Sequence, residues 1–134
     1  MTLRDDLVRD EGLKLKPYRC TAGKLTIGVG RNLDDVGISR DEAMVLLAND
    51  IARVKADASH AFPWFARLDE VRQEVVLNMI FNLGINRFSQ FYQTIQCIES
   101  ADYAGASERM LASLWAKQVG QRAIRLARRM KEGV

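Results

Sequence analysis

Residues 10–30 read DEGLKLKPYRCTAGKLTIGVG, and this stretch joins two kinds of local structure. Upstream of it, Thr2 and Asp5 have the spacing of a capping box, which predicts a short helix that ends at Gly12. Downstream, the LTI segment favours extended structure and lies between glycines that permit tight turns. The stretch therefore predicts an N-terminal helix followed by a small β-hairpin, with Glu11 at their junction.

The rest of the chain has mainly helical patterns. Ser39 and Glu42 form a second capping box, ahead of an apolar stripe typical of a long helix. Asp69 is expected to cap a helix that ends at Gly84 and is apolar around most of its circumference, as in a central buried helix. Three shorter helices are expected at about 89–99, 102–114 and 121–131. The predicted fold class is α+β, mostly helical.

The composition excludes several classes of protein. The chain has 134 residues, of which 48% are hydrophobic and 28% charged, as in an ordinary soluble domain. No apolar run reaches the roughly 18 residues that span a bilayer, and the charged N-terminus does not resemble a signal peptide. We therefore expect synthesis and folding in a cytoplasm, with Cys20 and Cys97 as free thiols. Since His60 is the sole histidine, a Ser-His-Asp triad or a zinc site is not expected. No metal or cofactor is predicted.

Positive charge is concentrated at the C-terminus. From Arg109 to Val134 the chain carries seven Lys or Arg residues and one acidic residue, Glu132, although its overall net charge is only +3. This pattern indicates either a solvated helix face or a surface for an anionic partner, such as a phosphate-bearing envelope. No base-reading motif accompanies the charge, so nucleic acid is not an expected partner.

The reactive groups available to this chain are carboxylates and a thiol. Glu11 stands out because a cleft can form where a helix meets a β segment. Gly28-Val29-Gly30 does not continue as a phosphate-binding loop, because Leu33 occupies the place of the third glycine. These glycines are better explained by a tight hairpin.

Several segments together resemble the T-even phage lysozymes, glycoside hydrolase family 24. The segments are Asp10-Glu11-Gly12-Leu13-Lys14-Leu15-Lys16 with Tyr18, Leu25-Thr26-Ile27-Gly28-Val29-Gly30, Asp41-Glu42-Ala43, Leu68-Asp69-Glu70-Val71-Arg72, Asn78-Met79-Ile80-Phe81-Asn82-Leu83-Gly84, and Trp115 with Arg122. The resemblance covers nearly the whole chain. It implies a single lysozyme-like domain, 1–134, with two lobes. The expected parts are a small β lobe at about 12–38, an interlobe helix at about 39–58, and a helical lobe at about 62–134 on which helix 2–11 packs.

The resemblance also implies a catalytic set of Glu11, Cys20 and Thr26. In the family a Glu is followed after eight residues by Asp or Cys, and after five more by Thr. Glu11 would be the general acid, Cys20 the group on the other side of the cleft, and Thr26 a positioning hydroxyl. Because a free thiol is mostly protonated at pH 7, we expect a cation among Arg19, Lys24 and Arg31 to favour the Cys20 thiolate. Inversion at the sugar is expected by analogy, and retention is the alternative.

Substrate-binding residues are implied on both lobes. They are Arg31, Asn32, Phe81, Asn82, Thr94, Gln118 and Arg122. Arg31 and Asn32 depart from the histidine and leucine familiar in the family, and the β lobe is short. Arg122 is expected to pair with Glu11 and tether the lobes.

The implied function is that of a phage endolysin, a bacteriolytic muramidase. It would hydrolyse the bond between N-acetylmuramic acid and N-acetylglucosamine in peptidoglycan strands, as a monomer. We expect it to be made in the host cytoplasm without a signal or anchor segment and to reach the wall once the membrane is opened. The alternatives are a lytic transglycosylase, which needs only one Glu, and a non-catalytic cell-wall-binding module.

Overall fold

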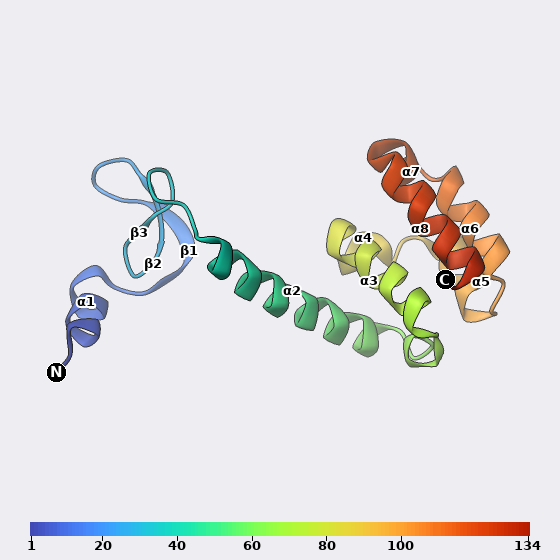
Figure 1. The fold of residues 1–134 in the computed structure, drawn as a ribbon, viewed down its shortest axis with the longest axis horizontal. Coiled ribbons are helices and arrows are strands. Elements are labelled where there is room, and N and C mark those ends of the chain that lie inside the picture. The colour runs from blue at the N-terminus through green and yellow to red at the C-terminus, as the bar shows by residue number, and fades with distance from the viewer. The chain divides into compact units, whose positions relative to one another are not determined.

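The computed structural model describes all 134 residues, which form two compact units. Unit 1 comprises Met1–Leu46 and unit 2 comprises Leu47–Val134. The blue end of Figure 1 contains the strands, whereas the yellow to red part contains helices alone. Helix α2, Arg40–Ala61, begins in unit 1 and continues into unit 2. The predicted α+β, mostly helical class is confirmed.

Unit 1 is built from one helix and a small sheet. The elements are α1, Leu3–Glu11; β1, Lys14–Arg19; β2, Leu25–Gly28; and β3, Arg31–Asn32. The predicted capping box at the start of α1 is present, with the Asp5 N–H donating to Thr2 Oγ1 at 3.2 Å and the Asp5 carboxylate accepting from the Thr2 N–H. The strands are antiparallel in the order β1-β2-β3, so the expected hairpin gains a third, two-residue strand.

Thr26 occupies the middle of this sheet. It pairs with Tyr18 on β1 and with Asn32 on β3, and only 4% of its surface is exposed. A residue of the central strand has neighbours on both sides, which explains this burial in so small a sheet. The position of Thr26 is therefore fixed by two strand pairings.

Helix α3, Glu70–Leu83, is the centre of unit 2. Asp69 caps it by accepting from the Arg72 N–H at 3.1 Å, and Gly84 ends it at a positive φ of 84°. Its fully buried residues are Val75, Val76, Met79 and Ile80. Such a helix lies inside the core, as its apolar circumference predicted.

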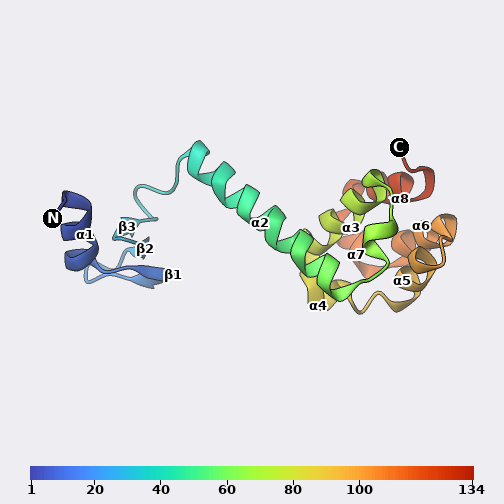
Figure 2. The same ribbon diagram turned by 90° about the horizontal axis from the view of Figure 1, so that it is seen from below.

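Shorter elements precede and follow α3 in the chain (Figure 2), and of these α4 and α8 pack against it. They are the 3₁₀ turn Phe65–Arg67 and the helices α4, Ile85–Phe88; α5, Tyr92–Glu99; α6, Tyr103–Ala112; α7, Leu114–Val119; and α8, Gln121–Glu132. The prediction of three helices after α3 was incomplete, because α4 and α7 are too short to produce a periodic pattern. Ser113 begins α7 by accepting from the Ala116 N–H at 3.1 Å.

Arg72 joins α3 to the end of α8. Its guanidinium donates to the carbonyl oxygens of Met130 at 2.6 Å and Lys131 at 2.9 Å, and its charge lies 3.8 Å from the Tyr103 ring centre. Carbonyls in the last turn of a helix lack backbone partners and carry partial negative charge, so a half-buried cation stabilises them. None of the helices combines the length and apolar character needed to cross a bilayer.

Candidate active site

Glu11 is the last residue of α1 and lies against the turn that joins β2 to β3. A β-carbon built on Gly30 would be 3.0 Å from Glu11 Oε2 and 3.2 Å from its carboxyl carbon. Gly30 has a φ of +68°, which L-residues rarely adopt. The absent side chain and the positive φ together allow the carboxylate to lie directly over this turn.

Cys20 and Thr26 meet at the other end of the hairpin. Cys20 begins the turn after β1: its N–H donates to the Lys24 carbonyl at 3.0 Å, and its own carbonyl accepts from the Gly23 N–H at 2.8 Å. The half-buried thiol is thereby placed near several backbone donors. The backbone N–H groups of Lys24 and then Ala22 lower the pKa of Cys20, and the Thr26 hydroxyl adds a smaller effect in the same direction.

The cations expected to favour the Cys20 thiolate are directed elsewhere. Arg19 lies 3.8 Å from Asp34, Lys24 lies 3.2 Å from Asp35, and Arg31 lies 2.8 Å from Glu42, each measured between the charged atoms. The expectation of a cationic partner was therefore wrong. Hydrogen bonds from a tight turn lower the pKa of the thiol instead, because they stabilise its charged form.

Arg31 and Asn32 hold the loop that follows the sheet. Arg31 donates to the Gly37 carbonyl at 3.1 Å and to Glu42 at 2.9 Å. The bond to Glu42, followed by that from the Ser39 N–H, lowers the pKa of Glu42 to about 2. The Asn32 amide donates to the Asp35 carboxylate at 3.0 Å, and its carbonyl accepts from the Asp35 N–H at 2.9 Å. Both side chains thus have structural partners within unit 1, and their contact with substrate stays a prediction.

Four of the five expected substrate-binding residues of unit 2 line two hollows, and Asn82 lines neither. Phe81 and Arg122 line one of about 430 Å³, together with Leu47, Ile51 and Asn78. Arg122 donates to Asn78 Oδ1 at 3.0 and 2.7 Å. Its expected pairing with Glu11 joins residues of different units and stays a prediction.

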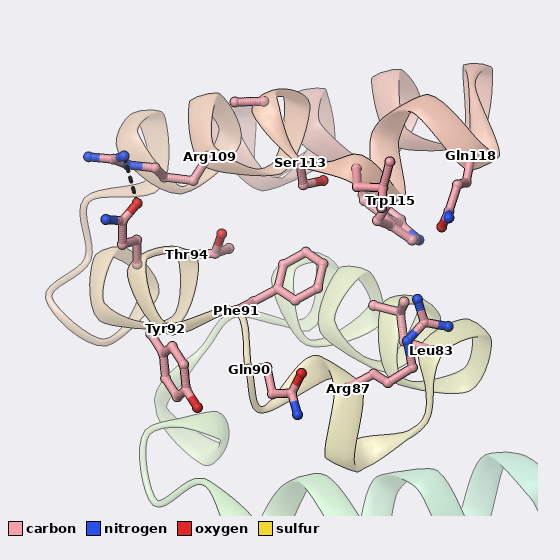
Figure 3. A pocket seen from close by; sticks show the side chains of 13 residues that line it. Leu83, Arg87, Gln90, Phe91, Tyr92, Thr94, Arg109, Ser113, Trp115 and Gln118 are labelled. Carbon is pink, nitrogen blue, oxygen red and sulfur yellow. Dashed lines mark hydrogen bonds between the residues drawn. The ribbon is translucent and has the colours of Figure 1, made fainter.

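The second hollow, of about 640 Å³, is lined by Thr94 and Gln118 (Figure 3). Trp115 also lines it, and its indole N–H donates to Asn82 Oδ1 at 2.8 Å, so Asn82 positions an aromatic ring. Arg87, Tyr92 and Arg109 also line this hollow, and the sequence did not predict that they would. These exposed polar side chains lack a periodic or motif signal of their own.

Comparison with known proteins identifies the class. A family model described as phage lysozyme matches residues 8–132. An endolysin of Acyrthosiphon pisum secondary endosymbiont phage 1 is 32% identical over 118 residues, covering 85% of this chain and 78% of that protein. A probable T4-type lysozyme of Dictyostelium discoideum is 27% identical over 154 residues, covering 93% of this chain and 91% of that protein. The SAR-endolysin of Escherichia phage Mu is 31% identical over 110 residues, covering 80% of this chain and 63% of that protein.

The small sheet, the helical unit and these relatives together identify the chain as a glycoside hydrolase of the lysozyme class. It belongs to the phage lysozyme family, whose model matches almost its entire length. Its function is therefore that of a phage muramidase that lyses peptidoglycan. The transglycosylase and the non-catalytic wall-binding module are not favoured by these comparisons.

The contact between Glu11 and Gly30 predicts different effects for two glycine substitutions. Gly30→Ala places a methyl group against the Glu11 carboxylate, whereas the added carbon of Gly28→Ala meets no atom within 4 Å. Both positions have positive φ, so each variant should lose about 1–2 kcal/mol of stability. Only Gly30→Ala should also lose activity, on the order of 10²-fold, because it would displace the carboxylate that the sequence predicts to be the catalytic acid. Thermal unfolding and the rate of peptidoglycan clearing measure the two effects, and equal activity of both variants would contradict the assignment.

Proposed function

We propose that Glu11 is the general acid of this lysozyme and that Cys20, as the thiolate, is the catalytic group on the other side of the scissile bond. The observation that carries this proposal is the position of all three candidate residues in unit 1. Glu11 lies over the Gly30 turn, and Cys20 and Thr26 lie together at the β1–β2 turn. Their sequence spacing is that of the family's catalytic set.

In this mechanism Glu11 gives its proton to the leaving glycosidic oxygen as the C1–O bond breaks. Positive charge then develops on the sugar ring, and a thiolate stabilises it as a carboxylate would. The hydroxyl of Thr26 helps to position the water that attacks C1, with inversion as the expected outcome. The alternative is attack of the thiolate on C1, followed by hydrolysis of the carbon–sulfur bond and retention. Anomeric proton NMR of the first product distinguishes the two.

Substitution of the two proposed groups tests the proposal. Glu11→Gln should reduce clearing of purified, lipid-free peptidoglycan by about 10²–10⁴-fold, the usual cost of losing a general acid. Cys20→Asp should stay active with reducing muramic acid ends, since the variant restores a negative group, and Cys20→Ala should be slow. Mass spectrometry of the sugar ends provides the second readout. If Cys20→Ala is as fast as wild type, Cys20 has no role in the reaction, and anhydro ends would instead indicate a transglycosylase.

The lowered pKa of Cys20 predicts the acidic limb of the pH–rate profile. As pH falls through this pKa, the thiolate gains a proton and activity falls. In Cys20→Asp the corresponding group has an ordinary pKa of about 3.9, so its acidic limb should move to lower pH. Cys97→Ala is the control, because Cys97 is a free, half-buried thiol packed against the core of unit 2. Coincident acidic limbs for wild type and Cys20→Asp would exclude a catalytic thiolate.

We propose that glycan strands also contact the two hollows of unit 2. The lining residues concerned are Phe81, Thr94, Gln118 and Arg122, and Asn82 acts beside them by holding Trp115. Within unit 1, Arg31 and Asn32 are proposed as separate substrate contacts. Exposed Phe81 offers an apolar surface of the kind on which a sugar ring packs, and Gln118 offers an exposed amide. Loss of either side chain should raise KM more than it lowers kcat, and the opposite result would place that residue outside the binding surface.

We propose that the outer face of α8 attracts the enzyme to anionic envelopes. Two of the α8 arginines have internal partners, Arg122 at Asn78 and Arg129 at Glu74, the latter 2.8 Å away. Arg125, Arg128 and Lys131 are exposed and have no ion pair.

A triple Gln variant of these three should clear whole envelopes more slowly at low salt and match wild type at high salt, where surface charge is screened. Short soluble glycan fragments are the control, because their cleavage should be unchanged. Salt-independent lysis by the wild type would contradict the proposal.

We also propose that the monomeric enzyme is made in the host cytoplasm and acts on the wall once the membrane is opened. The endolysin name of the phage relative supports this route. Expression of the chain alone should leave cells intact until a membrane-permeabilising agent is added. Spontaneous lysis before that addition would contradict the route.

A further inference from the structure

Asp34, in the loop that follows β3, holds the beginning of β2 from outside the hairpin. Its carboxylate accepts from the Leu25 N–H at 2.8 Å. The neighbouring Leu33 N–H donates to the Leu25 carbonyl at 2.7 Å, so the loop binds Leu25 through both of its backbone polar groups. Leu25 also pairs with Arg19 on β1. The end of the β1–β2 turn is therefore fixed by the loop as well as by the neighbouring strand.

The peptide group between Lys24 and Leu25 connects Asp34 with two of the proposed catalytic residues. Its N–H is the one that donates to Asp34. Its carbonyl oxygen accepts from the Cys20 N–H at 3.0 Å and from the Thr26 hydroxyl at 2.9 Å. Because a peptide group is planar, an acceptor that fixes its N–H also fixes the direction of its carbonyl. A charged acceptor in addition polarises the group and strengthens the hydrogen bonds to its oxygen.

Arg19 links Asp34 to a second point of the same turn. Its guanidinium lies 3.8 Å from the Asp34 carboxylate and donates to the Gly23 carbonyl at 3.1 Å. The Gly23 N–H in turn donates to the Cys20 carbonyl at 2.8 Å. The Asp34 side chain is 44% exposed, and an exposed ion pair contributes little to stability. The effect of Asp34 is therefore expected on the geometry of the turn and not on global stability.

We propose that Asp34 is a positioning residue: it holds this peptide group in the orientation that Cys20 and Thr26 need to act on the sugar. The inference rests on the proposed function and adds a residue that lies outside the sequence spacing of the catalytic set. Asp34 acts through the peptide group and not through the substrate. A neutral acceptor of the same shape, Asn, preserves the hydrogen bond, whereas Ala removes it.

Asp34→Asn and Asp34→Ala separate the hydrogen bond from the charge, because both remove the charge and only Asn keeps an acceptor for the Leu25 N–H. On lipid-free peptidoglycan, kcat of Asp34→Ala should be about 5–10-fold below that of Asp34→Asn, as expected for the loss of one hydrogen bond. KM should differ by less than about 2-fold, since substrate binding is not altered. Asp6→Ala is the matched control and should keep the wild-type kcat. The Asp6 carboxylate is 42% exposed and pairs with Arg9 at 3.1 Å, but it accepts from no backbone N–H of the hairpin.

Titration of the Cys20 thiol provides a readout independent of activity. In a Cys97→Ala background Cys20 is the sole thiol, and its rate of reaction with an aromatic disulfide reagent rises with the thiolate fraction. The midpoint of this rise should lie at higher pH in Asp34→Ala than in Asp34→Asn. A turn released from Asp34 no longer directs the N–H groups of Ala22 and Lys24 at the sulfur, and these groups stabilise its charged form.

Charge effects cancel in this comparison. Both variants lack the carboxylate charge and retain the other charged side chains that pair at the turn, Arg19, Lys24 and Asp35. Thermal unfolding shows whether each variant folds. Should Asp34→Ala fail to fold, Asp34→Glu is the second variant, because it keeps the charge and moves the acceptor by one methylene group. Its kcat should also fall, whereas a kcat equal to wild type would overturn the inference.

Equal kcat of Asp34→Asn and Asp34→Ala, or equal midpoints of the Cys20 titration, also overturns the inference while hydrolysis still stands. Full activity of Cys20→Ala would instead contradict the proposed function. In that case the thiol titration would still decide whether Asp34 orients the turn.

Discussion

The site of unit 1 depends on a contact that only glycine permits, since a side chain at position 30 would begin where the Glu11 carboxylate lies. The chain can turn there because Gly30 adopts a φ of +68°, and α1 can end beside it because Gly12 adopts a φ of +77°. Two backbone positions without a β-carbon thus determine where the carboxylate lies. Within this unit, the position of the proposed acid is a consequence of turn geometry.

The hairpin also explains how a thiol at position 20 can be stabilised as an anion. A turn of few residues directs the N–H groups of Ala22 and Lys24 toward the Cys20 sulfur, and such donors stabilise any anion at that place. Thr26 has one hydroxyl proton, which it donates to the Lys24 carbonyl at 2.9 Å in this structure. The same hydroxyl also contributes to the lowered pKa of Cys20, so Thr26 acts on both sides of this turn.

Local signals explain how much of the fold the sequence predicts. The caps at Thr2, Ser39 and Asp69 and the apolar circumference of α3 are properties of contiguous residues, and the structure contains all of them. The third strand was missed because two residues leave no alternating pattern, and it exists only by pairing with β2. In the same way, spacing selects Glu11, Cys20 and Thr26 as candidates, but the ionic partners of Arg19, Lys24 and Arg31 depend on the loop at 34–42. Sequence proximity suggested that these cations serve the thiol, and tertiary placement directs them to carboxylates.

The basic C-terminal segment shows why net charge alone does not identify a partner. Arg122 and Arg129 lie on the inner side of α8, where Asn78 and Glu74 accept from them, and they help to hold that helix on α3. Arg125, Arg128 and Lys131 face solvent, and Arg109, on α6, lines the larger hollow of unit 2. One cluster in the sequence therefore separates into a structural set, a surface set and a pocket residue. Only the last two sets are free of acidic partners, and surface charge of this kind acts on anionic partners over about a Debye length in salt solution.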